Sequence, residues 1–259
     1  MNPTLQTIHN RRSVRKYKPG PLSQEQKDTI LQAAMRSPTA GNMMLYSIIE
    51  VENQTIKDRL AETCDNQPFI ATAAYMLLFL ADYQRWYDLY QAAHSEQRAQ
   101  ELGISPRNPA EGDLLLAMMD ALIAAQTAVL AAESIGVGSC YIGDIIENWE
   151  IHQELFDLPQ YTIPAALLCF GEPADVPPNR LLKRFDRKFI VHQDSYQRFN
   201  PQELNDIYLP FDRKSFQHQE FPNGAQNIVQ FNYLRKFTAD FSLEMNRSVR
   251  VMIDKWCGR

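Results

Sequence analysis

The sequence has few of the residues that mark metal centres, redox thiols or dinucleotide loops. Its four cysteines lie far apart and include no C-x-x-C pair, which predicts reduced thiols in a cytosolic protein. The five histidines form no H-E-x-x-H pair, so we expect no metal site. Only ten glycines are present, and none of them belongs to a G-x-G-x-x-G fingerprint.

Long hydrophobic runs are also lacking. The most apolar region, residues 114–137, is interrupted by Asp120, Gln126 and Glu133. Its uncharged stretches are therefore shorter than the ~20 residues that a membrane span requires. The opening residues, MNPTLQTIHNRRS, contain no apolar signal-peptide core. We expect a cytoplasmic protein with no membrane partner.

Positive charge is in deficit: 26 Lys and Arg stand against 31 Asp and Glu, for a net charge of −5. Nucleic-acid binding needs a basic face that displaces counterions from phosphates, so the balance argues against a nucleic-acid partner. The 259 residues, 45% of them hydrophobic, suffice for one large domain or two small ones with a buried core.

Hydrophobic periodicity predicts helices that alternate with buried strands. Strands are expected at residues 45–51, 75–82 and 163–173, and residues 136–143 are expected to form a Gly-rich return. Helices are expected at residues 5–8, after a capping box at Ser23 and Gln26, and at residues 55–63, 83–102, 113–134 and 148–158. A largely helical tail follows residue 200.

Two of these helices carry specific expectations. The helix after Ser23 presents four apolar side chains on one face, namely Ile30, Leu31, Ala34 and Met35. The helix over residues 113–134 is apolar on most sides and ends at Gly136. A helix of that kind must be buried, either in a core or at a subunit interface.

Cations gather in the stretch HNRRSVRKYKPGPLS, at residues 11, 12, 15, 16 and 18. The cluster has three interpretations: a solvated charged face, a nucleic-acid patch that the net charge disfavours, or a phosphate site. In a phosphate site, two guanidiniums and the Ser13 hydroxyl would hold the dianion through charge-assisted hydrogen bonds. A second basic cluster at residues 183–188 favours this third interpretation, because two clusters can clamp one anionic ligand.

Four segments, RRSVRKY, SPTAGNMMLYSIIEV, GVGSCYIGDI and LLKRFDRKFIVHQDSY, follow one another in a recognisable order and spacing. Over nearly its whole length the chain resembles the FMN-dependent nitroreductases. More narrowly, it resembles the A-type, NADPH-preferring subgroup of oxygen-insensitive nitroreductases and flavin reductases. The resemblance implies an α+β fold with a mixed, mostly antiparallel sheet flanked by helices, in an intertwined homodimer. Residues 1–199 would form the FMN-binding domain, and residues 200–259 a helical extension packing on the dimer.

The resemblance also implies a set of FMN-binding residues. They are Arg11, Arg12, Ser13, Val14, Arg15, Pro38, Thr39, Asn42, Gln67, Tyr141, Ile142, Gly143, Asp144, Lys183 and Arg184. Residues 11–13 would hold the phosphate, with Arg184 as a second cation, and Arg15 would lie near flavin N1 and the C2 carbonyl. Residues 38–42 would approach the flavin from the partner chain. Gln67 would hydrogen-bond the flavin, and residues 141–144 would cover the ring with a backbone N–H directed at N5.

Two positions depart from the family pattern. Many members carry Gln-Pro-Trp after the asparagine, whereas residues 44–46 here read Met-Leu-Tyr, and Met44 has no amide to donate a hydrogen bond. The usual Lys-x-Arg is also altered, because Leu182 takes the lysine position and Lys183 follows it. In the tail, Arg213 is the candidate for binding the NADPH 2′-phosphate.

The implied activity is an FMN-dependent oxidoreductase with ping-pong kinetics. NADPH or NADH would deliver hydride to flavin N5, and a nitroaromatic, quinone or flavin acceptor would then take its place. No side chain is expected to be catalytic, and Arg15 would tune the flavin electrostatically. Three alternatives stay open: a non-catalytic or sensing FMN-binding protein, another flavin reaction such as reductive dehalogenation, and a helical interaction protein without a ligand.

Overall fold

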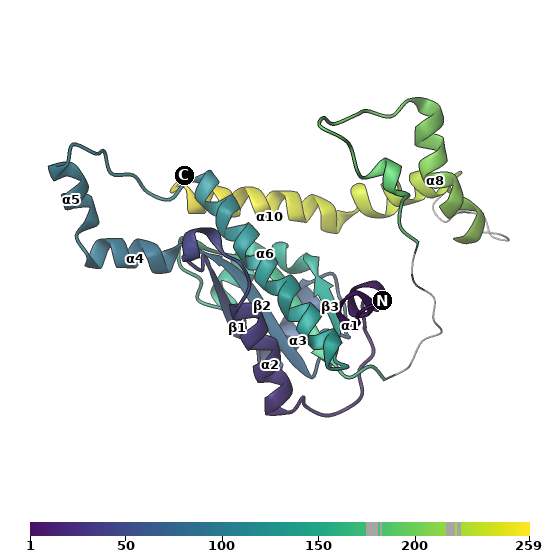
Figure 1. The fold of residues 1–259 in the computed structure, drawn as a ribbon, viewed down its shortest axis with the longest axis horizontal. Coiled ribbons are helices and arrows are strands. Elements are labelled where there is room, and N and C mark those ends of the chain that lie inside the picture. Colours follow the sequence, from purple (N-terminus) through teal and green to yellow (C-terminus); the bar gives the residue numbers. More distant parts are fainter. Residues whose placement is uncertain (175–180, 182, 216–220, 222–223) are drawn as a thin grey trace. The chain divides into compact units, whose positions relative to one another are not determined.

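The computed structural model describes residues 1–174, 181, 183–215, 221 and 224–259 (Figure 1). The chain forms two compact units, residues 1–178 with 244–259, and residues 179–243. The sequence-based division between residues 199 and 200 coincides with neither boundary, and as a division of roles it stays a prediction.

The first unit is built on a four-stranded sheet. Its strands are β1 (Tyr46–Glu50), β2 (Tyr75–Asp82), β3 (Gly138–Ile142) and β4 (Thr162–Gly171), in the order β1-β2-β4-β3. All three neighbouring pairs are antiparallel, and Ser13 adds a parallel bridge to Ser139 of β3. The three predicted strands are confirmed. The prediction of a Gly-rich return was wrong, because residues 138–142 pair with β4 and form the edge strand.

Helices pack on both faces of this sheet, and helices are also the main elements of the second unit, whereas most of α10 (Asp240–Trp256) belongs to the first unit. The first unit contains α1 (Pro3–Asn10), α2 (Gln24–Met35), α3 (Gln54–Thr63), α4 (Gln84–Ala92), α5 (Ser95–Glu101), α6 (Glu111–Ser134) and α7 (Trp149–Leu155). Later in the chain come α8 (Pro201–Ser215), α9 (Ile228–Asn232), a π-helical turn (Tyr233–Phe237) and α10 (Asp240–Trp256). Short 3-10 helices form at Ala40–Asn42, Gly143–Ile146 and Arg187–Phe189. The single helix predicted at residues 83–102 is two helices, because His94 takes a φ of +52° between them.

Successive residues of β2 face two separate hydrophobic layers, which explains why this strand is apolar throughout. Met76 and Leu78 pack in the layer that includes residues of α3, α7 and α10. Leu77 and Phe79 point the other way, toward α2 and α6. Figure 1 shows α2 and α6 side by side on that face of the sheet.

The start of α2 follows the predicted capping box. The Ser23 hydroxyl accepts from the Gln26 N–H at 3.2 Å, and the Gln26 side chain accepts from the Ser23 N–H at 2.9 Å. Ile30 and Ala34 are fully buried, as predicted. Met35 is 65% exposed, so its predicted place on the buried face was wrong. It follows Ile30 by five positions, which turns it about 140° around the helix.

Helix α6 confirms the predicted long apolar helix, and Gly136 follows its end with a φ of +79°. Its small side chains pack on the sheet: Ala117, Ala121, Ala124, Ala125, Ala128 and Ala132. Its outer side leaves five large apolar side chains exposed, here called the apolar strip: Leu115, Leu116, Met119, Leu122 and Ile123. In the described part of the chain, α6 alone has the length and composition of a membrane span, yet its alanine face is core.

Candidate functional site

The cation-rich N-terminal segment is fixed along the edge of the sheet. The Val14 N–H donates to the Ser139 carbonyl of β3 at 2.8 Å. Farther along, the Lys18 N–H donates to the Glu172 carbonyl at 2.8 Å, just beyond β4. These bonds order the backbone of residues 11–18, so their cations are presented from a defined edge rather than from a solvated loop.

Two glycines allow this close approach. A Cβ added to Gly138 would come within 2.6 Å of the Val14 side chain, and one added to Gly171 within 2.7 Å of the Tyr17 ring. The Tyr17 hydroxyl in turn donates to the Val14 carbonyl at 2.8 Å. Val14 and Tyr17 therefore anchor the segment on the sheet edge, with Ser13 and Arg15 on either side of Val14.

The guanidiniums of Arg11, Arg12 and Arg15 have no carboxylate within ion-pairing distance among the described residues. In contrast, Lys18 pairs with Glu172 at the surface. The Arg15 guanidinium lies 5.8 Å from the centroid of the Phe69 ring. Two of these guanidiniums, Arg11 and Arg12, together with the exposed Ser13 hydroxyl make a donor set that fits a phosphate group.

A hydrogen bond joins two further loops beside this segment. The Gln67 Nε2 group donates to the Asp144 carboxylate at 2.7 Å and to the Cys64 carbonyl at 3.0 Å. Both amide N–H groups are thereby used, and the Gln67 amide oxygen is left to accept from a ligand. Asp144 belongs to the 3-10 helix that directly follows β3.

Strand β3 brings these groups together. Burial raises the pKa of the Cys140 thiol, and the nearby Arg15 and Arg11 and a hydrogen bond with Ser13 oppose the rise. Asp144 acts on the same thiol and raises its pKa further. Cys140 is therefore within electrostatic reach of both the arginine segment and the Gln67–Asp144 pair, so these residues share one edge of the sheet.

The other residues predicted between positions 141 and 144 differ in their contacts and exposure. The Tyr141 hydroxyl donates to the Gln126 side chain of α6 at 3.3 Å, and burial raises the Tyr141 pKa to about 12. Ile142 is 2% exposed and packs in the core, so only its backbone is available to a ligand. Gly143 is exposed at the start of the 3-10 helix.

Pro38, Thr39 and Asn42 lie in the loop between α2 and β1, and Thr39 contacts a different part of α6. The Asp120 carboxylate accepts hydrogen bonds from the Thr39 hydroxyl and from the Ala40 N–H. Pro38 and Asn42 are exposed, and Asn42 has a φ of +58°.

Helix α6 separates this loop from the arginine segment within one chain. Arg11 and Arg12 act electrostatically on Glu133, near the end of the helix. Glu133 follows Asp120 by 13 positions, or about 20 Å along the helix axis. Within one copy of the chain, the Thr39 contact and the contacts of Arg11 and Arg12 therefore lie near turns of α6 that are well separated along the helix.

The match with known proteins decides the family. The profile of the Nitroreductase family covers residues 8–172. The chain belongs to this family. It is 32% identical to an oxygen-insensitive NADPH nitroreductase of Salmonella typhimurium, over 76% of each chain. It is 29% identical to an FMN reductase [NAD(P)H] of Bacillus subtilis, over 89% of this chain and 91% of that one.

A solved structure supports the nitroreductase fold over the whole chain. The NfrA2 structure from B. megaterium superposes with a TM-score of 0.82 at 28% identity, covering 99% of this chain and 98% of that one. The predicted α+β nitroreductase fold is thus confirmed. Among the described residues, the parallel part of the predicted mixed sheet is limited to the bridge between Ser13 and Ser139.

Sequence reasoning missed two buried carboxyl groups in this nitroreductase. In the sequence Asp120 appears only as an interruption of an apolar run, and no pattern marks Glu147. Glu147 is 4% exposed, and burial together with the neighbouring Asp144 carboxylate raises its pKa to about 8. Its Oε1 atom is buried with no hydrogen-bond partner among the described residues. For Asp120 the signal was a carboxyl residue inside an otherwise apolar stretch, whereas Glu147 has polar neighbours and the sequence gives no such signal.

The predicted C-terminal site residues belong to the second unit. Lys183 and Arg184 are both exposed there, and their part in phosphate binding stays a prediction. Leu182 and the side chain of Arg213 lie outside the described residues. The altered lysine position and the proposed 2′-phosphate contact are therefore untested.

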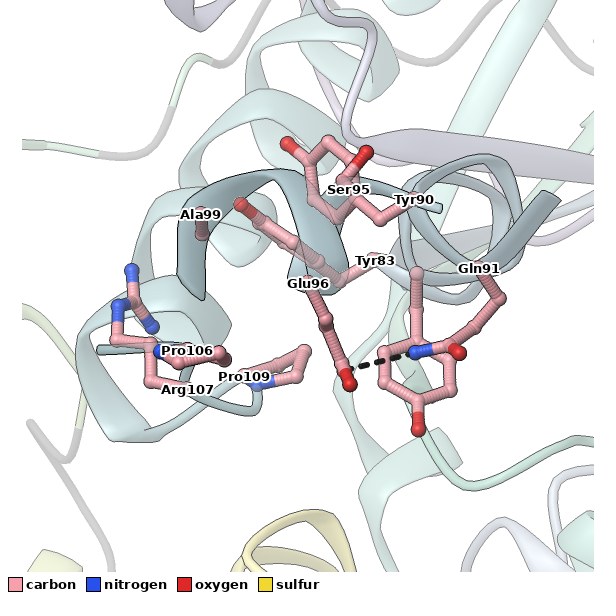
Figure 2. Close-up of a pocket in the computed structure, with 10 residues that line it drawn as sticks. Tyr83, Tyr90, Gln91, Ser95, Glu96, Ala99, Pro106, Arg107 and Pro109 are labelled. Atoms are coloured by element: carbon pink, nitrogen blue, oxygen red, sulfur yellow. Dashed lines mark hydrogen bonds between the residues drawn. The ribbon is translucent and has the colours of Figure 1, made fainter. Parts of the chain in front are cut away.

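A separate pocket of about 270 Å³ opens between α4, α5 and the loop that follows them (Figure 2). Tyr83, Tyr87 and Tyr90 line it, and across it Gln91 donates to Glu96 at 2.9 Å. The Arg107 guanidinium of its wall is paired with Asp113 at 3.0 Å. None of the predicted nitroreductase site residues lines this pocket, and its cation is already neutralised, so it is not the phosphate site.

Proposed function

We propose that the protein is an NAD(P)H-dependent FMN oxidoreductase that reduces nitroaromatics, quinones or flavins. The observation that carries this proposal is the set of three guanidiniums, Arg11, Arg12 and Arg15, which have no carboxylate partner among the described residues and lie beside the Gln67–Asp144 pair. A ligand with a phosphate at one end and a flat hydrogen-bonding ring at the other matches both halves. The relatives named NADPH nitroreductase and FMN reductase support the same cofactor and electron donor.

Each part of the site has a proposed task. Arg11, Arg12 and Ser13 bind the FMN phosphate through charge-assisted hydrogen bonds. The Gln67 amide oxygen accepts from the ring system, and backbone N–H groups of residues 141–144 face it. Bound FMN supplies the chemistry that passes two electrons from a nicotinamide to an acceptor.

Arg15 acts as a fixed positive charge beside the ring. Its backbone is held through the Val14–Ser139 hydrogen bond, and its guanidinium lies near the Phe69 ring. Because it is oriented before reduction begins, it stabilises the negative charge that reduction adds without a reorganisation cost. Protons for the acceptor come from solvent, so no side chain needs to act as a general acid.

The site is completed by a second copy of the chain, in a cytoplasmic homodimer. The apolar strip of α6 supports this arrangement, since five large apolar side chains on one helix face favour burial against a partner. The separation of Asp120 from Glu133, about 20 Å along the helix axis, supports it further, because the loop at residues 38–42 can serve the arginines of the other copy. Residues 200–259 would pack on the dimer, and Lys183 and Arg184 would add to the phosphate site.

The experiment is an anaerobic titration of the FMN-loaded protein with NADPH and, separately, with NADH, followed at the flavin absorbance band. We expect the band to bleach and to return when a quinone or a nitrofuran is added. A protein that binds FMN but is not bleached would be a non-catalytic or sensing FMN-binding protein. A protein that takes up no FMN would exclude the whole proposal and leave a helical interaction protein.

A further inference from the structure

Asp120 is the centre of the contacts that hold the loop between α2 and β1. Its carboxylate accepts from the Thr39 hydroxyl, from the Ala40 N–H at 3.0 Å and from the Leu45 N–H at 3.2 Å. The Thr39 oxygen also accepts from the Met44 N–H at 2.8 Å. One side chain of α6 thus fixes both ends of the seven-residue stretch from 39 to 45.

Asp120 is buried, and burying a carboxylate costs free energy unless its oxygens find hydrogen-bond donors. The residue is 3% exposed, and no Lys, Arg or His of the described chain forms an ion pair with it. A buried carboxylate without a cation is stabilised only by the hydrogen bonds it accepts. Among the described residues, the hydrogen bonds that the Asp120 side chain accepts all come from residues 39–45, so the loop and the carboxylate depend on each other.

The backbone of residues 39–45 includes three positive φ values, a conformation that needs stabilising contacts. Gly41, Asn42 and Met44 all have positive φ values, of 55°, 58° and 49°. For residues other than glycine this conformation is sparsely populated and persists only where the surroundings enforce it. From the other side, Trp86 donates to the Met43 carbonyl at 2.7 Å and Arg85 donates to the Met44 carbonyl at 3.0 Å.

We propose that Asp120 is a positioning residue for cofactor binding: it holds residues 39–45 in the conformation that presents Asn42 to the FMN of the partner subunit. The Thr39 hydroxyl both donates to Asp120 and accepts from Met44, so Thr39 serves to brace the loop and Asn42 is the residue that reaches the ligand. This inference rests on the proposed function.

Asp120 lies next to the apolar strip of α6. Met119 precedes it in the apolar strip, and Leu122 and Ile123 follow in the next turn. The same turn of the helix that would form the subunit interface therefore also holds the loop that completes the partner's site. Dimer formation and placement of the loop are linked through one rigid element.

The test compares Asp120→Asn with Asp113→Asn, which removes a carboxylate from the same helix. Asp113 caps α6 and pairs with Arg107, and it makes no contact with the loop. FMN dissociation constants are measured by quenching of flavin fluorescence, and hydrogen exchange of the Ala40 and Leu45 amides is measured in the FMN-free protein. We expect Asp120→Asn to weaken FMN binding about tenfold and to speed exchange of both amides. Asp113→Asn should lower the melting temperature and change neither quantity.

Three outcomes are decisive. If Asp120→Asn binds FMN as tightly as the wild type although its stability falls, Asp120 is merely structural and the inference is overturned. If the wild type itself binds no FMN, the proposed function fails first and takes the inference with it. Should Asp120→Asn not fold, Thr39→Val breaks the same hydrogen bond from the loop side. That variant must then show the loss of FMN affinity, and wild-type affinity in it would refute the role of Asp120.

Discussion

The Val14 side chain occupies the space where Gly138 would carry a Cβ atom, 2.6 Å from the Val14 Cγ2 atom. The contact joins a segment near the N-terminus to the edge strand of the sheet, and the Val14–Ser139 hydrogen bond lies directly beside it. The positions of the neighbouring arginines therefore depend on the absence of a side chain 124 positions later in the chain.

Replacing Gly138 by alanine should push the arginine segment away from β3. Gly138 does not have a positive φ, so the backbone accepts alanine and only the contact with Val14 is affected. Overpacking of this kind costs about 1–3 kcal/mol, and we expect FMN affinity to fall at least tenfold, or about 1.4 kcal/mol. The control is Gly112→Ala in the first turn of α6, where a Cβ meets nothing within 4 Å. Equal FMN affinity in both variants would mean that the close approach has no part in binding.

Arg15→Ala should keep much of the FMN affinity, because Arg11 and Arg12 remain for the phosphate. The rate of flavin reduction by NADPH should fall by about 10–100-fold, since a fixed charge is lost next to the reducible ring. Stopped-flow absorbance under anaerobic conditions measures this rate directly. Lys18→Ala removes the same charge three positions away, from a surface pair with Glu172, and should reduce normally. Unchanged reduction in Arg15→Ala would remove Arg15 from its proposed role.

Glu147 should make the stability of the protein depend on pH. Its pKa rises from the usual 4.5 to about 8 through burial and the Asp144 carboxylate, with Asp65 and Glu244 adding to the effect. The folded state thus keeps a proton that the unfolded chain loses. The free energy of unfolding should fall as pH rises from 4.5 to about 8, with a slope of up to about 1.4 kcal/mol per pH unit.

Urea unfolding of wild type and Glu147→Gln across this window checks the slope. The lowered pKa of His152 has the opposite effect only below its ordinary value of 6.5, so the upper half of the window isolates Glu147. The variant should lose the negative slope there. Parallel curves for the two proteins would show that Glu147 ionises as it does in an unfolded chain.

Met119→Glu should convert the homodimer to a monomer and abolish tight FMN binding. Met119 is 54% exposed in the single chain, so the substitution costs little there, but it would place a charge within the apolar strip of the interface. Light scattering gives the mass, and flavin fluorescence gives the affinity. Leu89→Glu, at an exposed apolar position of α4, should leave both unchanged. A Met119→Glu dimer with normal FMN affinity would place the interface elsewhere.

Local signals predicted much of the fold. The capping box of Ser23 and Gln26 and the continuous apolar run of β2 depend on nearby residues, and both were predicted correctly. β3 was missed because it contains Gly138 and is defined by its pairing with β4, a partner that no local pattern reveals. The break at His94 was not predicted, because a single residue with positive φ leaves the helical periodicity on each side intact.

The site was predictable where it depends on residue type and not where it depends on contacts between distant residues. The cations of residues 11–15 are visible as a cluster, and the resemblance named Gln67 and Asp144. Their mutual hydrogen bond joins positions 77 apart and required the fold. Asp120 was the largest omission, because an aspartate in an apolar helix indicates a buried polar contact without naming its partner.

The most direct test of a site shared between two chains is subunit complementation in mixed dimers. One chain carries Arg11→Ala with Arg12→Ala, the other Thr39→Val with Asn42→Ala, and each homodimer should bind FMN poorly. In the mixed dimer, one site combines intact arginines with an intact loop, so we predict one tightly bound FMN per dimer that NADPH reduces at the wild-type rate. Mixed dimers that bind no more FMN than their parents would contradict the account, because each chain would then build its site from its own residues.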